Sequence, residues 1–369
     1  MKKITLVFGT RPEAIKMCPL VLELKSRPRE FDVSVVVTGQ HREMLDSVLQ
    51  AFRVVPDIDL NIMSVSQTLF DVTQRVLAEM RRVLTENRPD VLLVHGDTTT
   101  AFASALAAFY LEIPVGHVEA GLRTYDIHAP YPEEFNRAAI DASAEYFFAP
   151  TAATRENLLR EGKPAERIFV TGNTEIDALR FTVRGEYSHA ELDWAADSRL
   201  VVMTAHRREN LKNAANPEGA MRGIFRAILR VVNEHPDVKI VYPVHLNPAV
   251  RDAAELLQNH PRIHLIEPLG VLDFHNFLAK AHLVLTDSGG IQESAPALGK
   301  PVLVLRDTTE RPEGLQAGTL RLAGTGEDGV YAEFTRLLDD EKLYAEMSAA
   351  KNPYGDGTSA RQIADILAK

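Results

Sequence analysis

The sequence predicts an α/β protein of two doubly wound domains, each a parallel sheet with helices on both faces, that face each other across a cleft. Three observations predict this fold. The short apolar runs are continuous Val, Ile and Leu segments rather than alternations, which is typical of strands buried on both faces. Longer helix-like stretches separate these runs, as right-handed βαβ units require. The length of 369 residues suits two domains of ordinary size.

The expected elements fall into two sets. Strands of the first set are expected at 4–8, 33–37, 91–94, 115–118, 146–148 and 168–170, and those of the second at 200–203, 238–241, 263–266, 283–285 and 302–305. The polar stretch 184–198 separates the sets, so we expect a first domain at 1–172 and a second at 173–358. Ligands of such sheets bind beyond the carboxyl ends of the strands, so we expect the functional residues in the loops that follow the strands.

The composition excludes some classes of protein. A net charge of −10 argues against a nucleic-acid binder, so any bound anion needs a local basic pocket. The single cysteine, Cys18, cannot form an intramolecular disulfide and fits the cytoplasm. Beside Met17 and Pro19 it is interpreted as core filling. No run is long enough to span a membrane, and the run 4–8 predicts a first strand rather than a signal peptide.

The first junction runs from Gly9 to Lys16. A glycine turn ends the strand, and Pro12 opens a helix. The N–H groups of that helix, with the cations Arg11 and Lys16, suit a diphosphate. An ordinary strand–helix turn with solvated charges explains the pattern equally well.

Two further junctions end their strands with a His and a carboxylate two residues apart, His95 with Asp97 and His117 with Glu119. Residues i and i+2 of a strand share a face, so all four side chains converge if the strands are neighbours. Three interpretations stay open. The groups are structural, with Asp97 capping a helix and the histidines bonded to the backbone, or an acid–base set, or a metal site.

A helix is expected from about residue 133, with Glu133 and Glu134 in its first turn. Acidic residues at this position favour the helix dipole. The pattern therefore favours a structural role for Glu134 and leaves Glu133 open.

The second domain has two junctions of its own. Residues 204–210 contain many side chains that can donate hydrogen bonds to an anion, among them His206 and Arg207. The stronger signal is Ser288-Gly289-Gly290 before a helix, since glycines let the backbone approach a phosphate and the helix N-terminus supplies N–H donors. Arg311 follows the next strand and adds a cation.

Taken in this order, the junctions resemble the non-hydrolysing UDP-N-acetylglucosamine 2-epimerases over nearly the whole chain. The matching segments are 9–16, 39–42, 95–100, 117–123, 132–134, 206–210, 242–248, 287–292, 306–312 and 352–357. The resemblance implies the GT-B fold of two Rossmann-like domains with UDP in the cleft, and a C-terminal helix at about 359–369 on the first domain. It also implies a homodimer, no metal and no nicotinamide cofactor.

The activity that the resemblance implies is the reversible C2 epimerisation of UDP-N-acetylglucosamine to UDP-N-acetylmannosamine, by elimination and re-addition of UDP through 2-acetamidoglucal. A GT-B glycosyltransferase, a hydrolysing epimerase and a non-catalytic UDP-sugar sensor are the alternatives. Carried over by position, the catalytic residues are Asp97, Glu119, Glu133 and His206. The implied substrate contacts are Arg11, Lys16, Leu269, Phe274, Ser288, Gly289, Gly290, Ser294 and Arg311. Gln40, Arg207 and His245 match positions that bind a second, activating UDP-N-acetylglucosamine in some members.

The chain departs from the family at three places. Ser294 stands where the family usually has a glutamate that binds the ribose hydroxyls. Glu293, about 100° away around the helix, is not expected to replace it. The loop 211–219 is longer than usual, and Glu43 stands where some regulated members have Gln.

Overall fold

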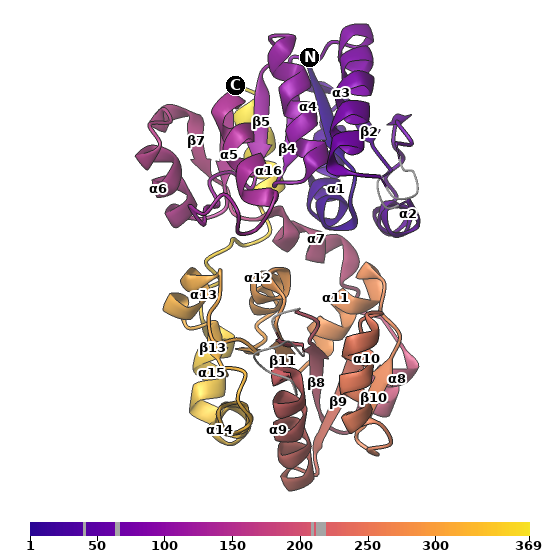
Figure 1. The fold of residues 1–369 in the computed structure, drawn as a ribbon, viewed down its shortest axis with the longest axis vertical. Coiled ribbons are helices and arrows are strands. Elements are labelled where there is room, and N and C mark those ends of the chain that lie inside the picture. Colours follow the sequence, from indigo (N-terminus) through magenta and orange to yellow (C-terminus); the bar gives the residue numbers. More distant parts are fainter. Residues whose placement is uncertain (40–41, 63–66, 208–209, 212–218) are drawn as a thin grey trace. The chain divides into compact units, whose positions relative to one another are not determined.

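The computed structural model describes residues 1–39, 42–62, 67–207, 210–211 and 219–369. Its contacts divide the chain into two compact units. Unit 1 comprises Met1–Phe181 and Tyr354–Lys369, and unit 2 comprises Thr182–Pro353. Each unit is a parallel sheet flanked by helices, which confirms the predicted fold class (Figure 1). None of the helices in these described ranges is long and apolar enough to cross a membrane.

Unit 1 has a seven-stranded sheet in the order β3-β2-β1-β4-β5-β6-β7. The strands are β1 (Lys2–Phe8), β2 (Phe31–Val37), β3 (Ile58–Asp59), β4 (Val91–His95), β5 (Val115–Val118), β6 (Tyr146–Ala149) and β7 (Ile168–Val170). The helices are α1 (Arg11–Lys25), α2 (Arg42–Phe52), α3 (Leu69–Glu86), α4 (Thr99–Tyr110), α5 (Glu133–Ser143), α6 (Ala152–Arg160), the short η1 (Ala165–Arg167), α7 (Thr174–Thr182) and α16 (Ser359–Leu367).

Unit 2 has a six-stranded sheet in the order β10-β9-β8-β11-β12-β13. The strands are β8 (Arg199–Thr204), β9 (Val238–Pro243), β10 (Ile263–Ile266), β11 (Leu283–Thr286), β12 (Val302–Val304) and β13 (Leu320–Leu322). The helices are α8 (Ala190–Trp194), α9 (Ala220–Glu234), α10 (Pro248–Ala254), η3 (Glu255–Leu257), α11 (Val271–Lys280), α12 (Gly289–Ala297), α13 (Pro312–Ala317), α14 (Glu327–Asp339) and α15 (Glu341–Ala349).

Burial on both faces explains why the strands are continuous apolar runs. In β8, Val201 and Met203 belong to one core with α9 and α14. Leu200 and Val202 point the other way and belong to a second core with α11. Every predicted strand is present, and its ends differ from the prediction by at most about two residues.

The C-terminal helix α16 packs on α1 of unit 1 (Figure 1). Lys2 Nζ donates to the carbonyl of Leu367 at 2.8 Å. At the other end of α16 the carboxylate of Asp177 accepts the N–H groups of Ser359 and Ala360, at 3.2 and 2.9 Å. In α1 itself Cys18 is fully buried, as predicted, and burial raises the pKa of its thiol to about 12.

Each sheet has one point where the strand order reverses direction. In unit 1 this switch point lies between β1 and β4, and in unit 2 between β8 and β11. The loops after two such strands diverge and leave room for a ligand at their carboxyl ends. The loop after β4 carries Asp97, and the loop after β11 carries Ser288, so both predicted sites lie at switch points.

Candidate active site

The start of α1 supplies two cations to the switch point of unit 1. Thr10 caps this helix in a capping box with Glu13. A glycine is needed at position 9, because a Cβ there would lie 2.0 Å from the hydroxyl oxygen of Thr38, which follows β2. This turn places Arg11 and Lys16 within the first two turns of α1.

Glu119 is held by contacts from three directions. It directly follows β5 with a φ of 71°, a left-handed conformation that a residue with a Cβ adopts only when its surroundings impose it. Lys16 Nζ donates to its Oε1 at 2.5 Å, and Asn173 Nδ2 donates to the same oxygen at 2.9 Å. Its Oε2 lies 3.6 Å from His95 Nε2. The carboxylate therefore has a fixed position.

Asp97 is held by helix α5. Arg137 Nη2 lies 2.9 Å from its Oδ2, and Asn136 Nδ2 donates to its backbone carbonyl at 2.9 Å. Desolvation is the main cause that raises the pKa of Asp97, although 27% of the side chain stays exposed. Arg137 opposes this rise, whereas the charges of Glu119 and Glu133 add to it. The carboxyl group is therefore suited to exchange a proton nearer neutral pH.

The structural alternatives have different outcomes for the individual residues. Thr98 is the N-cap of α4, and its side chain accepts the N–H of Ala101, so the suggestion that Asp97 caps this helix is wrong. His117 is fully buried and bonds Asp141 Oδ1 at 2.6 Å and the Gly96 carbonyl at 2.7 Å. The interpretation that the histidines pair with the backbone is therefore confirmed for His117.

His95 differs from His117 because it approaches a candidate catalytic carboxylate. Burial lowers the pKa of His95 to about 3, so its imidazole is neutral at pH 7. Over the residues that the structure describes, no three His, Cys, Asp or Glu side chains form a group that could hold a metal ion.

Helix α5 also carries Glu133 and Glu134 in its first turn. Glu134 Oε1 accepts the N–H groups of Thr124 and Tyr125, each at 3.0 Å, so its role is structural, as the pattern favoured. Glu133 is half-buried in the first turn and close enough for its charge to raise the pKa of Asp97.

One cavity joins most of these groups. It has a volume of about 540 Å³, and its lining includes Arg11, Lys16, His95, Asp97 and Glu119. Glu133 does not line it. Glu13, which caps α1, also lines the cavity, so unit 1 presents three carboxylates and two cations to one space, which suits acid–base chemistry on a bound anion.

In unit 2 the glycine motif forms the predicted strand–turn–helix. Helix α12 begins at Gly289, and its N-cap Ser288 makes no side-chain cap bond. The N–H groups of such a first turn have no partner within the helix and suit a phosphate. Arg311 lies beside this turn: a Cβ added to Gly289 would be 3.6 Å from Arg311 Nη2. Arg311 also forms an ion pair with the buried Glu293.

Ser294 lies one turn further along α12. The residue is buried, with 1% exposed, and its hydroxyl donates to the carbonyl of Gly290 at 3.1 Å. The hydroxyl is thus used within its own helix. Glu293 is engaged by Arg311, and the expectation that it does not take over the ribose contact stays a prediction.

His206 lies opposite the glycine motif, across the switch point of unit 2. Its N–H and that of Arg207 both donate to Asp287 Oδ2, at 2.7 and 2.8 Å. Its ring stacks on His245, with 5.4 Å between ring centroids. Burial is the main cause that lowers the pKa of His206. Asp287 opposes this effect, whereas His245 and Arg207 reinforce it.

Leu269 and Phe274 lie around the start of α11, half-buried against the second core of unit 2.

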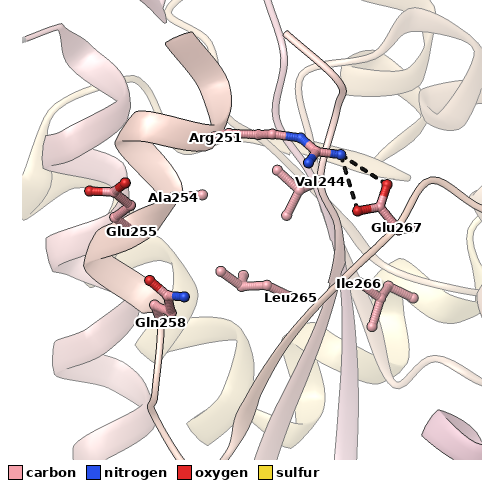
Figure 2. A pocket seen from close by; sticks show the side chains of 8 residues that line it. All are labelled: Val244, Arg251, Ala254, Glu255, Gln258, Leu265, Ile266 and Glu267. Atoms are coloured by element: carbon pink, nitrogen blue, oxygen red, sulfur yellow. Dashed lines mark hydrogen bonds and ion pairs between the residues drawn. The ribbon is translucent and has the colours of Figure 1, made fainter. Parts of the chain in front are cut away.

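A further cavity of about 410 Å³ lies between α10 and the end of β10, where Arg251 bridges to Glu267 (Figure 2). Of the predicted site residues that the structure describes, none lines this cavity. Gln40 and most of the loop 211–219 lie outside the described residues.

Sequence reasoning missed the side chains that hold the predicted ones. They are Asn136, Arg137, Asn173, Asp287 and Glu293. Asn173 and Asp287 do carry a signal, because each is a polar residue within about three positions of a strand end. The others lie within helices and carry no such signal.

Comparison with known proteins gives consistent matches. The family model described as UDP-N-acetylglucosamine 2-epimerase matches residues 22–368. The UDP-N-acetylglucosamine 2-epimerase of Bacillus subtilis (strain 168) is 57% identical over 366 residues, which cover 99% of this chain and 94% of that protein.

Solved structures agree. The UDP-GlcNAc 2-epimerase of Neisseria meningitidis bound to UDP-GlcNAc has a TM-score of 0.88 and 44% identity, with 99% of each chain covered. The Methanocaldococcus jannaschii UDP-GlcNAc 2-epimerase in complex with UDP-GlcNAc and UDP has a TM-score of 0.80 and 34% identity, again with 99% of each chain covered.

Proposed function

Because the chain belongs to the UDP-N-acetylglucosamine 2-epimerase family, we propose that it reversibly inverts C2 of UDP-N-acetylglucosamine to give UDP-N-acetylmannosamine. The observation that carries this proposal is the cavity in which Asp97 and Glu119 meet Arg11 and Lys16. Two fixed carboxylates beside cations are what proton transfer on a sugar that carries a diphosphate requires.

The chemical problem is that C2 has no neighbouring carbonyl, so its proton is not acidic at pH 7. Elimination of UDP solves this problem. The C1–O bond breaks, its electron pair leaves with the β-phosphate oxygen, and positive charge at C1 acidifies the C2 proton. A carboxylate takes this proton as the C1–C2 double bond of 2-acetamidoglucal forms. UDP then adds back to C1 while a second acid protonates C2 from the opposite face.

The proposal assigns roles to both units. Asp97, Glu119 and Glu133 are the catalytic carboxylates that exchange the C2 protons, and the charge of Glu133 also raises the pKa of Asp97. The N–H groups of Gly289 and Gly290, together with the Ser288 hydroxyl, Arg311 and His206, bind the diphosphate, and these contacts gain strength as its negative charge develops. Leu269 and Phe274 flank the uracil. Arg207 and His245 are proposed, with Gln40, to bind a second, activating UDP-N-acetylglucosamine.

The proposal also includes a homodimer in the cytoplasm. The homodimer rests on the family resemblance. The location rests on the single cysteine, which is buried and fits a reducing compartment.

Incubation with UDP-N-acetylglucosamine in D2O, followed by NMR, tests the reaction. Deuterium should enter C2 of both epimers, and small amounts of glycal and UDP should accumulate, because proton removal and UDP departure precede inversion. Epimers that keep all C2 protium would exclude this mechanism. Release of free N-acetylmannosamine would indicate a hydrolysing epimerase, and binding without turnover would indicate a sensor.

Ser294 provides a second test, on nucleotide affinity. Ser294→Glu is expected to tighten UDP binding a few-fold to tenfold, because a hydrogen bond to a charged group exceeds a neutral one by about 1 kcal/mol. Calorimetric titration of UDP measures this gain. Ser294→Ala is the matched control and should weaken binding a few-fold at most, because it removes one neutral hydrogen bond from a hydroxyl that also donates to the Gly290 carbonyl. Unchanged or weaker binding by Ser294→Glu would remove this position from the ribose site.

A further inference from the structure

Asp287 is a buried carboxylate at the switch point of unit 2, directly before the glycine motif. Its side chain is fully buried. Its Oδ2 accepts the backbone N–H groups of His206 and Arg207 at 2.7 and 2.8 Å. Arg207 Nε donates to the backbone carbonyl of Asp287 at 3.2 Å. These contacts tie the loop after β8 to the loop after β11.

The second carboxylate oxygen has a different environment. Asp287 Oδ1 is buried and, among the described residues, finds no hydrogen-bond partner. His206 Nδ1, a possible donor, lies 3.3 Å from this oxygen. A buried carboxylate oxygen without a donor is destabilising, so a proton on Nδ1 stabilises this arrangement. Such bonds are often long in the ligand-free state and shorten when substrate binds.

We propose that Asp287 is a positioning residue that accepts a hydrogen bond from His206 Nδ1. This bond keeps Nε2 of His206 directed for the diphosphate, so that the imidazolium can donate a hydrogen bond from Nε2 to a phosphate oxygen. The inference rests on the proposed function, in which His206 lies beside the diphosphate. It adds to that function a carboxylate–imidazole pair of the kind that fixes the tautomer and orientation of a histidine.

The charges around His206 explain why such a carboxylate is needed. The imidazole faces His245 from the loop after β9 and Arg207 from its own loop, and both disfavour an imidazolium, as does burial. Asp287, from the loop after β11, favours the imidazolium and opposes these effects. An imidazolium matters most as UDP leaves, when negative charge builds on the β-phosphate oxygen.

The test begins with nitrogen-15 NMR of the histidine side chains in the ligand-free protein. The signals of His206 are assigned as those missing from the His206→Gln spectrum. In the wild type, the neutral ring should carry its proton on Nδ1. In Asp287→Asn, the amide oxygen can keep the two backbone bonds while its NH2 group faces Nδ1. The neutral ring should then carry its proton on Nε2, and its ionisation should move to lower pH. A wild-type ring with the proton on Nε2 would overturn the proposal.

A double-mutant cycle on kcat is the second arm. Asp287→Asn should lower kcat about five- to tenfold, the difference between a charged and a neutral hydrogen bond. If Asp287 acts through His206, the double variant with His206→Gln should be no slower than His206→Gln alone. Multiplying losses would show a separate, structural role and overturn the proposal. The NMR arm needs no turnover, so an inactive wild type would refute the proposed function alone.

Discussion

Glu119→Gln is expected to lower kcat by roughly 10²–10⁴-fold, the usual effect of losing a positioned acid or base. The substitution keeps the shape of the side chain, and an amide oxygen can still accept from Lys16 Nζ and Asn173 Nδ2, which now lie 2.5 and 2.9 Å from Oε1. What is lost is the ability to take up and release a proton. UDP affinity should therefore change much less than kcat. Initial rates and calorimetry measure the two quantities.

Glu175→Gln is the matched control for this substitution. Glu175 Oε2 lies 3.9 Å from the same Lys16 Nζ, so its removal also changes the charge around the lysine. It does not line the cavity, and its kcat should stay within a few-fold of the wild type. Near wild-type turnover in Glu119→Gln would remove Glu119 from the mechanism. Equal losses in both variants would attribute the effect to Lys16.

The fold was predictable because a parallel strand covered on both faces needs an unbroken apolar run. The alternating residues of β8, which divide between two cores, show this requirement directly. The two missed strands lack such a run. β3 has only two residues, and β13 has three, with Arg321 in the middle. Edge strands this short carry too little pattern to be distinguished from a loop.

The location of the site was predictable from the strand ends, but the directions of its side chains were not. β4 and β5 are neighbours, as the convergence of their motifs required. The alternation that should place His117 beside Glu119 stops at the end of each strand, because Gly96 and Glu119 have φ values of 63° and 71°. His117 therefore bonds Asp141 instead of joining Asp97 and Glu119.

The supporting contacts were unpredictable for a different reason. Asn173 and Glu119 are 54 positions apart, and His117 and Asp141 are 24 apart. Each pair forms only because the sheet order brings its elements together, and a single sequence shows a residue type but not its partner. The sequence therefore identified the groups that do chemistry better than the groups that hold them.

Asp97→Asn is expected to lower kcat by roughly 10²–10⁴-fold with little effect on folding. The amide keeps one oxygen for Arg137, whose Nη2 now lies 2.9 Å from Oδ2. The matched control is Glu134→Gln, because Glu134 Oε2 lies 3.6 Å from Arg137 Nε. This control should lose about 1 kcal/mol of stability through its two backbone bonds, with kcat near that of the wild type. A wild-type kcat in Asp97→Asn would exclude Asp97 as a proton carrier.

The pH dependence of the rate then shows in which direction of the reaction Asp97 accepts the C2 proton and in which it donates it. Burial raises its pKa and Arg137 opposes the rise, so Arg137→Gln should raise that pKa further. In the direction in which Asp97 accepts the C2 proton, the rate falls as pH drops through this pKa. In the direction in which it donates, the rate falls as pH rises through it. The falling part of the pH–rate profile should therefore move to higher pH in Arg137→Gln for both directions. In Arg137→Lys it should return to its wild-type position. Rates started from each epimer distinguish the two directions. A lowered kcat with an unmoved pH–rate profile would show that Arg137 only supports the fold, because a purely structural loss does not change the proton affinity of Asp97.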